Sequence, residues 1–245
     1  MIQTFLSYRN LLILFPNKKG IEMNKTIVSL VCLIMFAFSS YCSASGKNME
    51  ALVDEVVKSA KAGDSESMHT LGDIYYNGTF FSQDYKKAID WYTKAAEAGA
   101  IGAMYNLGLI YGNGKEVPQD YKKAVKWYTK AAEAGDSESM HTLGDMYYHG
   151  TFFPQDYKKA VKWYTKAAEA GAIGAMYNLG RMWAMGKGVP QDYIKAYMWF
   201  NLAAVDGDSN STEGRRIVAK GMTVSQIEEG QRLTREWLDM HPALK

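Results

Sequence analysis

The sequence predicts an all-α protein, a solenoid of paired antiparallel helices. The first observation is a period of 36 residues, carried by columns of glycine, leucine-glycine and tryptophan: Gly63, Gly99, Gly135, Gly171 and Gly207; Leu71, Leu107, Leu143 and Leu179, each followed by a glycine; Trp91, Trp127, Trp163 and Trp199. The second is that apolar residues inside each unit recur at helical spacing. The third is a longer period of 72 residues, because GDSESMHTLGD begins at 63 and 135, and GAIGAMYNLG at 99 and 171. In-phase copies of one unit indicate a repeat array.

The composition fits a folded protein and excludes several classes. The chain has 245 residues, 47% of them hydrophobic and 22% charged, so it is not a disordered polymer, a collagen or a multi-span membrane protein. Its 2 Cys exclude a disulfide-dense scaffold. Removing the four basic residues and the one acidic residue of 1–44 from totals of 28 and 26 leaves 24 and 25, a net charge of −1. That balance gives no electrostatic case for binding nucleic acid or an anionic membrane.

Residues 23–44 have the layout of a secretory signal peptide. Lys25 precedes an apolar run from Ile27 to Phe38, and small residues lead to a cleavage site predicted after Ala44. The run is shorter than the roughly 20 apolar residues that span a bilayer, although a retained anchor stays an open alternative. Cleavage would remove both cysteines, leave no stable membrane insertion, and place the protein in the periplasm or outside the cell.

We interpret residues 1–22 as an annotation artefact. Lys18, Lys19 and Gly20 require a purine-rich coding stretch shortly before Met23, which in a bacterium resembles a ribosome-binding site ahead of the true start. The alternative is a genuine, unusually long leader in front of the apolar run.

The first helix of repeat one is predicted over about 66–77, because Met68, Leu71 and Tyr75 make one apolar face. A loop at 78–83 follows it. The small residue Gly72 permits close approach of a neighbouring helix.

The second helix of repeat one is predicted over about 85–98. Asp84 is placed to cap its N-terminus, and Gly99 is placed to end it in a left-handed conformation. Ala88, Trp91, Tyr92, Ala95 and Ala96 are expected to be buried, and Trp91 to supply bulk between the helix layers.

The same reading divides the chain into the following segments: 1–22 as the extension, 23–44 as the signal peptide, 45–62 as an N-terminal cap helix, 63–98, 99–134, 135–170 and 171–206 as repeats one to four, and 207–245 as C-terminal capping helices. Glu55 and Arg215 stand where Trp and Leu occur in the repeats, so both are expected to face solvent on terminal helices. Thr223 with Gln226 fits a capping box that opens a final helix to about Trp237.

The motif L-G-x-x-Y, followed by D-Y-x-K-A-x-x-W-Y-x-K-A-A-x-x-G, resembles the Sel-one-like repeat, a branch of the tetratricopeptide family. The resemblance covers residues 63–207 in four copies. It implies a right-handed superhelix that binds proteins or peptides. It also implies a non-catalytic scaffold or adaptor in the bacterial envelope or a secreted one, with a secreted host-interaction factor as an alternative.

The resemblance also implies which side chains line a binding groove, because the first helix of each pair lines the concave face in tetratricopeptide arrays. Carried over, the protein- or peptide-binding positions are His69, Asp73, Tyr76 and Asn77; Tyr105, Leu109 and Asn113; His141, Asp145, Tyr148 and His149; and Tyr177 and Arg181. Their spacing puts them on one stripe of each helix. With Arg181 as its one arginine, the stripe disfavours an acidic C-terminal peptide and favours an extended peptide with basic or aromatic side chains.

The loops of repeats one and three depart from the family pattern G-x-G-V. Phe80 and Phe152 replace a glycine that can take a positive φ, so the loop backbone should differ there. Phe81 and Phe153 fill the Val position and are expected to be core. Exposed contacts for a partner at Phe80 and Phe152 are one interpretation, and local packing is the other.

The second helices carry paired lysines that form a column along the outer face. They indicate either a contact surface for a partner or a solvated face. Catalytic motifs are missing: there is no H-E-x-x-H, G-x-S-x-G or P-loop. His69, His141 and His149 lie too far apart to share a metal at the expected helix spacing. The sequence therefore predicts no enzyme, no cofactor and no metal, with an envelope hydrolase or β-lactam-interacting enzyme as the alternative reading.

Overall fold

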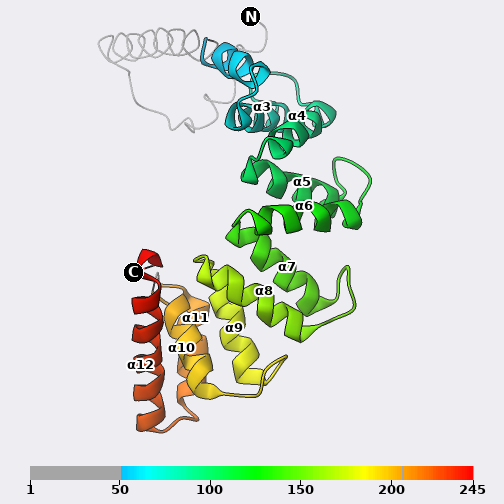
Figure 1. The fold of residues 1–245 in the computed structure, drawn as a ribbon. Helices are drawn as coiled ribbons and strands as arrows, with labels where there is room; N and C mark the ends of the chain where they lie inside the picture. Colours follow the sequence, from blue (N-terminus) through cyan, green and yellow to red (C-terminus); the bar gives the residue numbers. More distant parts are fainter. Residues whose placement is uncertain (1–50, 206, 245) are drawn as a thin grey trace, which may run out of the picture. The chain divides into compact units, whose positions relative to one another are not determined.

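The structure is a computed structural model that describes residues 51–205 and 207–244 (Figure 1). The chain divides into two compact units, residues 1–54 and 55–245, and the second unit holds the repeats. The expected extension at 1–22, the signal peptide at 23–44 and the start of the N-terminal cap helix lie outside the described residues. Residues 51–61 are helical, and Glu55 is exposed, as expected for a terminal helix.

The described part of the second unit is helical, with no strand in the ranges given above. Its repeats consist of a first helix and a second helix each, in the order α3 (Ser65–Asn77), α4 (Tyr85–Glu97), α5 (Ile101–Asn113), α6 (Tyr121–Glu133), α7 (Ser137–His149), α8 (Tyr157–Glu169), α9 (Ile173–Met185) and α10 (Tyr193–Ala203). They are followed by α11 (Ser209–Ala219), α12 (Val224–Met240) and the short 3-10 helix η2 (Pro242–Leu244). From α3 to α11, consecutive helices pack against each other in chain order, and α12 packs against α10; the fold is an α-solenoid of paired antiparallel helices (Figure 1).

An aspartate cap defines where the second helix of each repeat begins. The side chain of Asp84 accepts a hydrogen bond from the backbone N–H of Lys87 at 3.0 Å, and Asp120 and Asp156 do the same in the next two repeats. These backbone donors lower the pKa of all three carboxyls from the ordinary value of 3.8. The predicted cap at Asp84 is therefore confirmed. Gly99 also has the left-handed backbone expected of it, with φ 96°.

Tyrosine, rather than tryptophan, fills the space between the two helices of a pair. Tyr92 and Tyr164 are 2% and 1% exposed, and each ring lies against the glycine of the first helix, Gly72 and Gly144. A Cβ on Gly144 would lie 2.5 Å from Tyr164 Cδ1, which leaves no room for a side chain. Phe200 takes the same place over Gly180 in the last repeat.

The expectation that the tryptophan column is buried is wrong for three of its four members. Trp91, Trp127 and Trp163 are only half-buried, and a lysine ammonium lies over each ring at 4.4 to 4.8 Å: Lys94, Lys130 and Lys166. The reason is register, because the neighbouring tyrosine takes the position that faces the first helix. Trp199 alone of the four is buried, at 7% exposed, because α12 covers it and Trp237 packs edge-on against it at 5.7 Å.

The C-terminal helices close the array. Thr223 and Gln226 form the predicted capping box at the start of α12. Arg215, expected to face solvent, is instead half-buried, and its guanidinium donates to the Asn201 side chain at 2.6 Å. The difference arises because α11 packs against α10, so the position equivalent to the repeat leucine still faces a neighbour.

Candidate functional site

The face formed by α3, α5, α7 and α9, called here the first-helix face, carries the residues predicted to bind a partner. Nine of them are half-buried: His69, Asp73, Tyr76, Tyr105, Leu109, His141, Asp145, Tyr148 and Tyr177. Four are exposed: Asn77, Asn113, His149 and Arg181. The exposed members sit at or near the C-terminal ends of the first helices, where the chain turns into the loops.

A first hollow of about 220 Å³ lies between repeats one and two. It brings together four predicted residues from two repeats, Asp73, Tyr76, Asn77 and Leu109. Tyr92, Asn106 and Ile110 complete its wall. The hollow therefore combines an aromatic ring, an aliphatic side chain and several hydrogen-bonding groups, a mixture suited to holding a side chain of a partner.

A second hollow, also about 220 Å³, lies between repeats two and three. Four of its lining residues were predicted, namely Asn113, Asp145, His149 and Phe152, and the rest are Gly112, Tyr128, Thr142, Met146 and Thr151. The two hollows follow each other by one repeat, so the first-helix face offers successive pockets along the array.

Four further members of the predicted stripe pack inward. His69 lies 5.7 Å from the ring of Tyr92, and His141 lies 5.7 Å from Tyr164. Tyr105 and Tyr177 contact Tyr128 and Phe200 in the same way. These four side chains form a layer over the buried aromatic column beneath the stripe.

A four-residue hydrogen-bonded network occurs twice, in repeats that are 72 residues apart in sequence. In the first copy, the Tyr92 hydroxyl donates to Asp73 Oδ1 at 2.7 Å, and Asn106 Nδ2 lies 3.0 Å from His69 Nε2 and 3.4 Å from Asp73 Oδ1. The second copy has corresponding distances of 2.6, 3.0 and 3.4 Å, among Tyr164, Asp145, Asn178 and His141.

Each network joins a first helix to the next first helix. The sequence reasoning missed Asn106 and Asn178, although both recur at the 72-residue period 37 positions after a histidine. Burial and the bonded carboxylate raise the pKa of Tyr92, so its hydroxyl stays protonated and acts as a donor rather than as a base. The network consequently holds adjacent repeats together and fixes the carboxylates of Asp73 and Asp145.

The hydroxyls of Tyr76 and Tyr148, which are equivalent in the two blocks, have partners of opposite charge. Tyr76 donates to Glu116 Oε1 at 2.7 Å, and this bond raises the pKa of Tyr76 to about 12. Tyr148 accepts from Lys187 Nζ at 3.0 Å, which raises the pKa of that lysine. Both partners come from the loop of the following repeat, and neither Glu116 nor Lys187 was anticipated as a site residue.

The two loop phenylalanines differ in their surroundings. Phe152 is half-buried, and its ring centroid lies 3.9 Å from that of Tyr121 in the preceding repeat. Phe80 is 44% exposed. Phe81, expected in the core, is 37% exposed although it stacks on Tyr75 at 5.0 Å, so that expectation is wrong.

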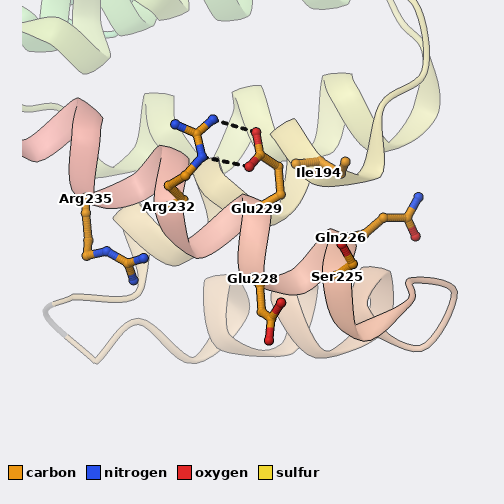
Figure 2. Close-up of a pocket in the computed structure, with 7 residues that line it drawn as sticks. All are labelled: Ile194, Ser225, Gln226, Glu228, Glu229, Arg232 and Arg235. Carbon is orange, nitrogen blue, oxygen red and sulfur yellow. Dashed lines mark hydrogen bonds and ion pairs between the residues drawn. The ribbon is translucent and has the colours of Figure 1, made fainter.

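Another depression, of about 530 Å³, lies between the start of α10 and α12 (Figure 2). Arg232 donates to Glu229 at 2.6 and 2.7 Å and also to Glu236, and the bonds from Arg232 lower the pKa of Glu229. None of the predicted site residues lines this depression. Because Arg232 pairs with glutamates of its own helix, on the exposed side of α12, the depression has the character of a solvated surface rather than of a site built by several repeats.

Across 51–205 and 207–244, no helix has both the length and the apolar character of a membrane span. Within the same ranges, no three His, Cys, Asp or Glu side chains are grouped so that they could hold a metal ion.

Residues 65–99, 101–136, 137–171 and 173–208 match the family profile of the Sel1 repeat, which covers more than half of the chain. No curated protein matches in the sequence search.

Among solved structures, a Sel1 repeat protein from Oxalobacter formigenes is 26% identical, with a TM-score of 0.64 over 74% of this chain and 84% of that one. A protective antigen of uropathogenic Escherichia coli with an SLR fold is 27% identical, with a TM-score of 0.49 over 78% of this chain; this chain spans about half of it, 49%. Cysteine-rich protein B of Helicobacter pylori is 26% identical, with a TM-score of 0.43 over 56% of this chain and 98% of that one.

Proposed function

The chain belongs to the Sel1 repeat family, whose members commonly act as protein-interaction scaffolds, and from this premise we propose that it binds an extended segment of a partner protein along the first-helix face. The observation that carries the proposal is the convergence of residues from adjacent repeats in two successive hollows. Asp73, Tyr76 and Leu109 meet in the first hollow, and Asn113, Asp145 and His149 meet in the second.

The chemistry of these hollows supports binding rather than catalysis. Tyr92, in the first hollow, donates its hydroxyl to Asp73, and burial together with that carboxylate raises the pKa of the Tyr92 phenol. Burial also raises the pKa of Tyr128, which lines the second hollow. Their hydroxyls are therefore poor proton acceptors near neutral pH. Aromatic rings beside fixed hydrogen-bonding groups are common at surfaces that recognise peptides.

Site-specific photo-crosslinking in living cells tests the binding face. A photoreactive amino acid is placed at Asn77 or His149, which are exposed beside the hollows, and at Lys86 or Lys158, which are exposed on the second helices of the same repeats. The proposal expects one partner to be captured from both first-helix positions and weakly, if at all, from the lysine positions. Equal capture from the second helices, or none from the first helices, would reject the first-helix face.

We further propose that the mature protein acts in the bacterial periplasm or outside the cell, after cleavage behind Ala44. Support for this comes from the basic start, apolar run and small residues of 23–44. Cell fractionation with mass spectrometry of the N-terminal peptide tests it: a mature N-terminus at Ser45 in the periplasm or medium is expected. An intact N-terminus in the cytoplasm would contradict this location, and peptides from 1–22 would contradict a start at Met23.

A further inference from the structure

The two 72-residue blocks are near copies, yet they differ where the first-helix face is lined. Asn77 corresponds to His149, Leu109 to Arg181, and Glu116 to Gly188. A duplicated surface that diverges at its lining residues presents two related binding surfaces with different charge preferences. The direction of the divergence is from acidic and neutral in the first block to basic in the second.

The first pocket is acidic. Asp73 lines it with a side chain that is 44% exposed, and Tyr76, another lining residue, donates its hydroxyl to Glu116 Oε1. The second carboxylate oxygen of Glu116, Oε2, is buried and accepts no hydrogen bond within the described part of the chain. Asp73 is the carboxylate that lines this pocket, and Glu116 lies behind it at hydrogen-bond distance from Tyr76, so a cationic group is the ligand that the pocket favours.

The equivalent surface between repeats three and four is basic. Lys187 Nζ donates to the Tyr148 hydroxyl at 3.0 Å and lies 4.9 and 5.1 Å from the ring centroids of Tyr148 and Tyr157. Arg181 is exposed, with its guanidinium 5.8 Å from the Tyr177 ring centroid. These two cations outweigh Asp145, and an anionic group is the ligand that they favour.

We infer that the first-helix face is acidic at the Tyr76 pocket and basic at the Tyr148 surface. It therefore selects a peptide that carries a basic side chain at the first position and an acidic side chain at the second. This inference rests on the proposed function. The two positions are two repeats apart, or roughly 20 Å if neighbouring first helices lie about 10 Å apart. An extended chain rises about 3.3 Å per residue, so the basic and acidic residues of the peptide should be separated by about six residues.

Because the two ends of the first-helix face prefer opposite charges, a peptide should bind more tightly in one direction than in the other. The order of the two charges along the peptide is consequently fixed, and a peptide with the charges exchanged should bind about tenfold more weakly, the factor that follows from about 1.4 kcal/mol. Salt should reduce this difference, since both charge contacts lie at a partly exposed surface.

Selection from a phage library of random dodecapeptides, on protein purified from cells that express the full chain, tests the inference. Enriched peptides are expected to share one charge order at about the spacing given above. Peptides that are enriched without a charge order would overturn the inference and leave the proposed function standing. If no peptide is enriched, the inference and the proposed binding of an extended segment both fail.

Charge-neutralising variants assign each end. Glu116→Gln keeps an acceptor for Tyr76 and should weaken binding of the selected peptide about fivefold, with no effect on a peptide whose basic residue is replaced by Gln. Arg181→Leu installs the residue that the first block carries at this position. Combined with Lys187→Gln, it should weaken binding of the selected peptide, with no effect on a peptide whose acidic residue is replaced by Gln. Equal losses for charged and neutralised peptides would show a structural effect and overturn the inference.

Discussion

The ring of Tyr128 occupies the space into which a side chain at Gly108 would project. A Cβ on Gly108 would lie 2.6 Å from Tyr128 Cε1. Tyr128 is 3% exposed and belongs to the core between α5 and α6, so it has little freedom to move away. We therefore expect Gly108→Ala to destabilise the protein by about 1–3 kcal/mol, measured by urea unfolding.

A matched control lies on the same helix. A Cβ on Gly112 would meet its nearest atom, Ala124 Cβ, at 3.6 Å, an ordinary contact. Gly112→Ala should leave stability unchanged or raise it by up to about 1 kcal/mol, because alanine favours the helix. Equal effects of the two substitutions would mean that helix propensity, and not the tyrosine ring, decides the outcome.

The hydroxyl of Tyr164 is expected to stabilise the packing of α8 on α7 within repeat three. Its bond to Asp145 is 2.6 Å long, and the aspartate side chain is 42% exposed. Because water screens the aspartate charge, the bond should stabilise the fold less than a hydrogen bond to a buried charged group does. Tyr164→Phe should cost about 1 kcal/mol in thermal or urea unfolding. Tyr128→Phe is the control, because Leu109 stands in repeat two where repeats one and three have an aspartate.

The helix caps should make the protein sensitive to acid. In the folded state the pKa values of Asp84, Asp120 and Asp156 lie below their ordinary value of 3.8. A depressed pKa contributes stability that is fully present above the unfolded-state pKa and is lost as the pH falls through the folded-state pKa. The free energy of unfolding should therefore decrease below about pH 4.

Replacing the three aspartates together by asparagine separates the cap from its charge. Asparagine still accepts the backbone hydrogen bond but does not titrate. The triple variant should lose less stability between neutral pH and pH 3 than the parent protein, as followed by circular dichroism in urea. The same acid slope in both proteins would assign the pH dependence to other carboxylates.

Neighbouring aromatic residues in α8 should differ strongly in their contribution to stability. Tyr164 is 1% exposed, so Tyr164→Ala should cost about 3–5 kcal/mol, as large-to-small core substitutions do. Trp163 is half-buried under Lys166, and Trp163→Ala should cost less than half as much. A larger loss from the tryptophan would contradict the assignment of the tyrosine column to the core.

The repeat period and helix caps were predictable because they depend on local sequence. Met68, Leu71 and Tyr75 mark the helical face of α3, and Asp84 marks the start of α4 whatever surrounds it. The sequence pattern placed both Trp91 and Tyr92 in the core, and it could not show that only Tyr92 would be buried there. Adjacent positions on a helix differ by about 100° in direction, and which of them meets the glycine depends on how the two helices pack.

Contacts between repeats limited what could be said of the candidate site. Tyr76 and Tyr148 have nearly identical sequence surroundings on their own helices, yet one hydroxyl meets Glu116 and the other meets Lys187. Those partners lie 40 and 39 residues further along the chain, in the loops of the following repeats. The two loops differ in sequence, because Gly188 stands in one where Glu116 stands in the other. A positive φ of 74° at Gly188, with the Tyr157 carbonyl 2.5 Å from where a Cβ would lie, makes glycine necessary in that loop.

The duplication of a two-repeat block has a consequence for the evolution of the chain. Helix α4 meets α5 through almost the same side chains with which α8 meets α9. If a further copy of 99–170 were inserted after residue 170, both of its new junctions would repeat helix–helix contacts that are already present in the protein. We expect such an elongated chain to fold and to melt at a higher temperature than the parent, since each added unit brings its own stabilising seam. Lengthening of this protein by gene duplication therefore requires no new type of helix–helix contact.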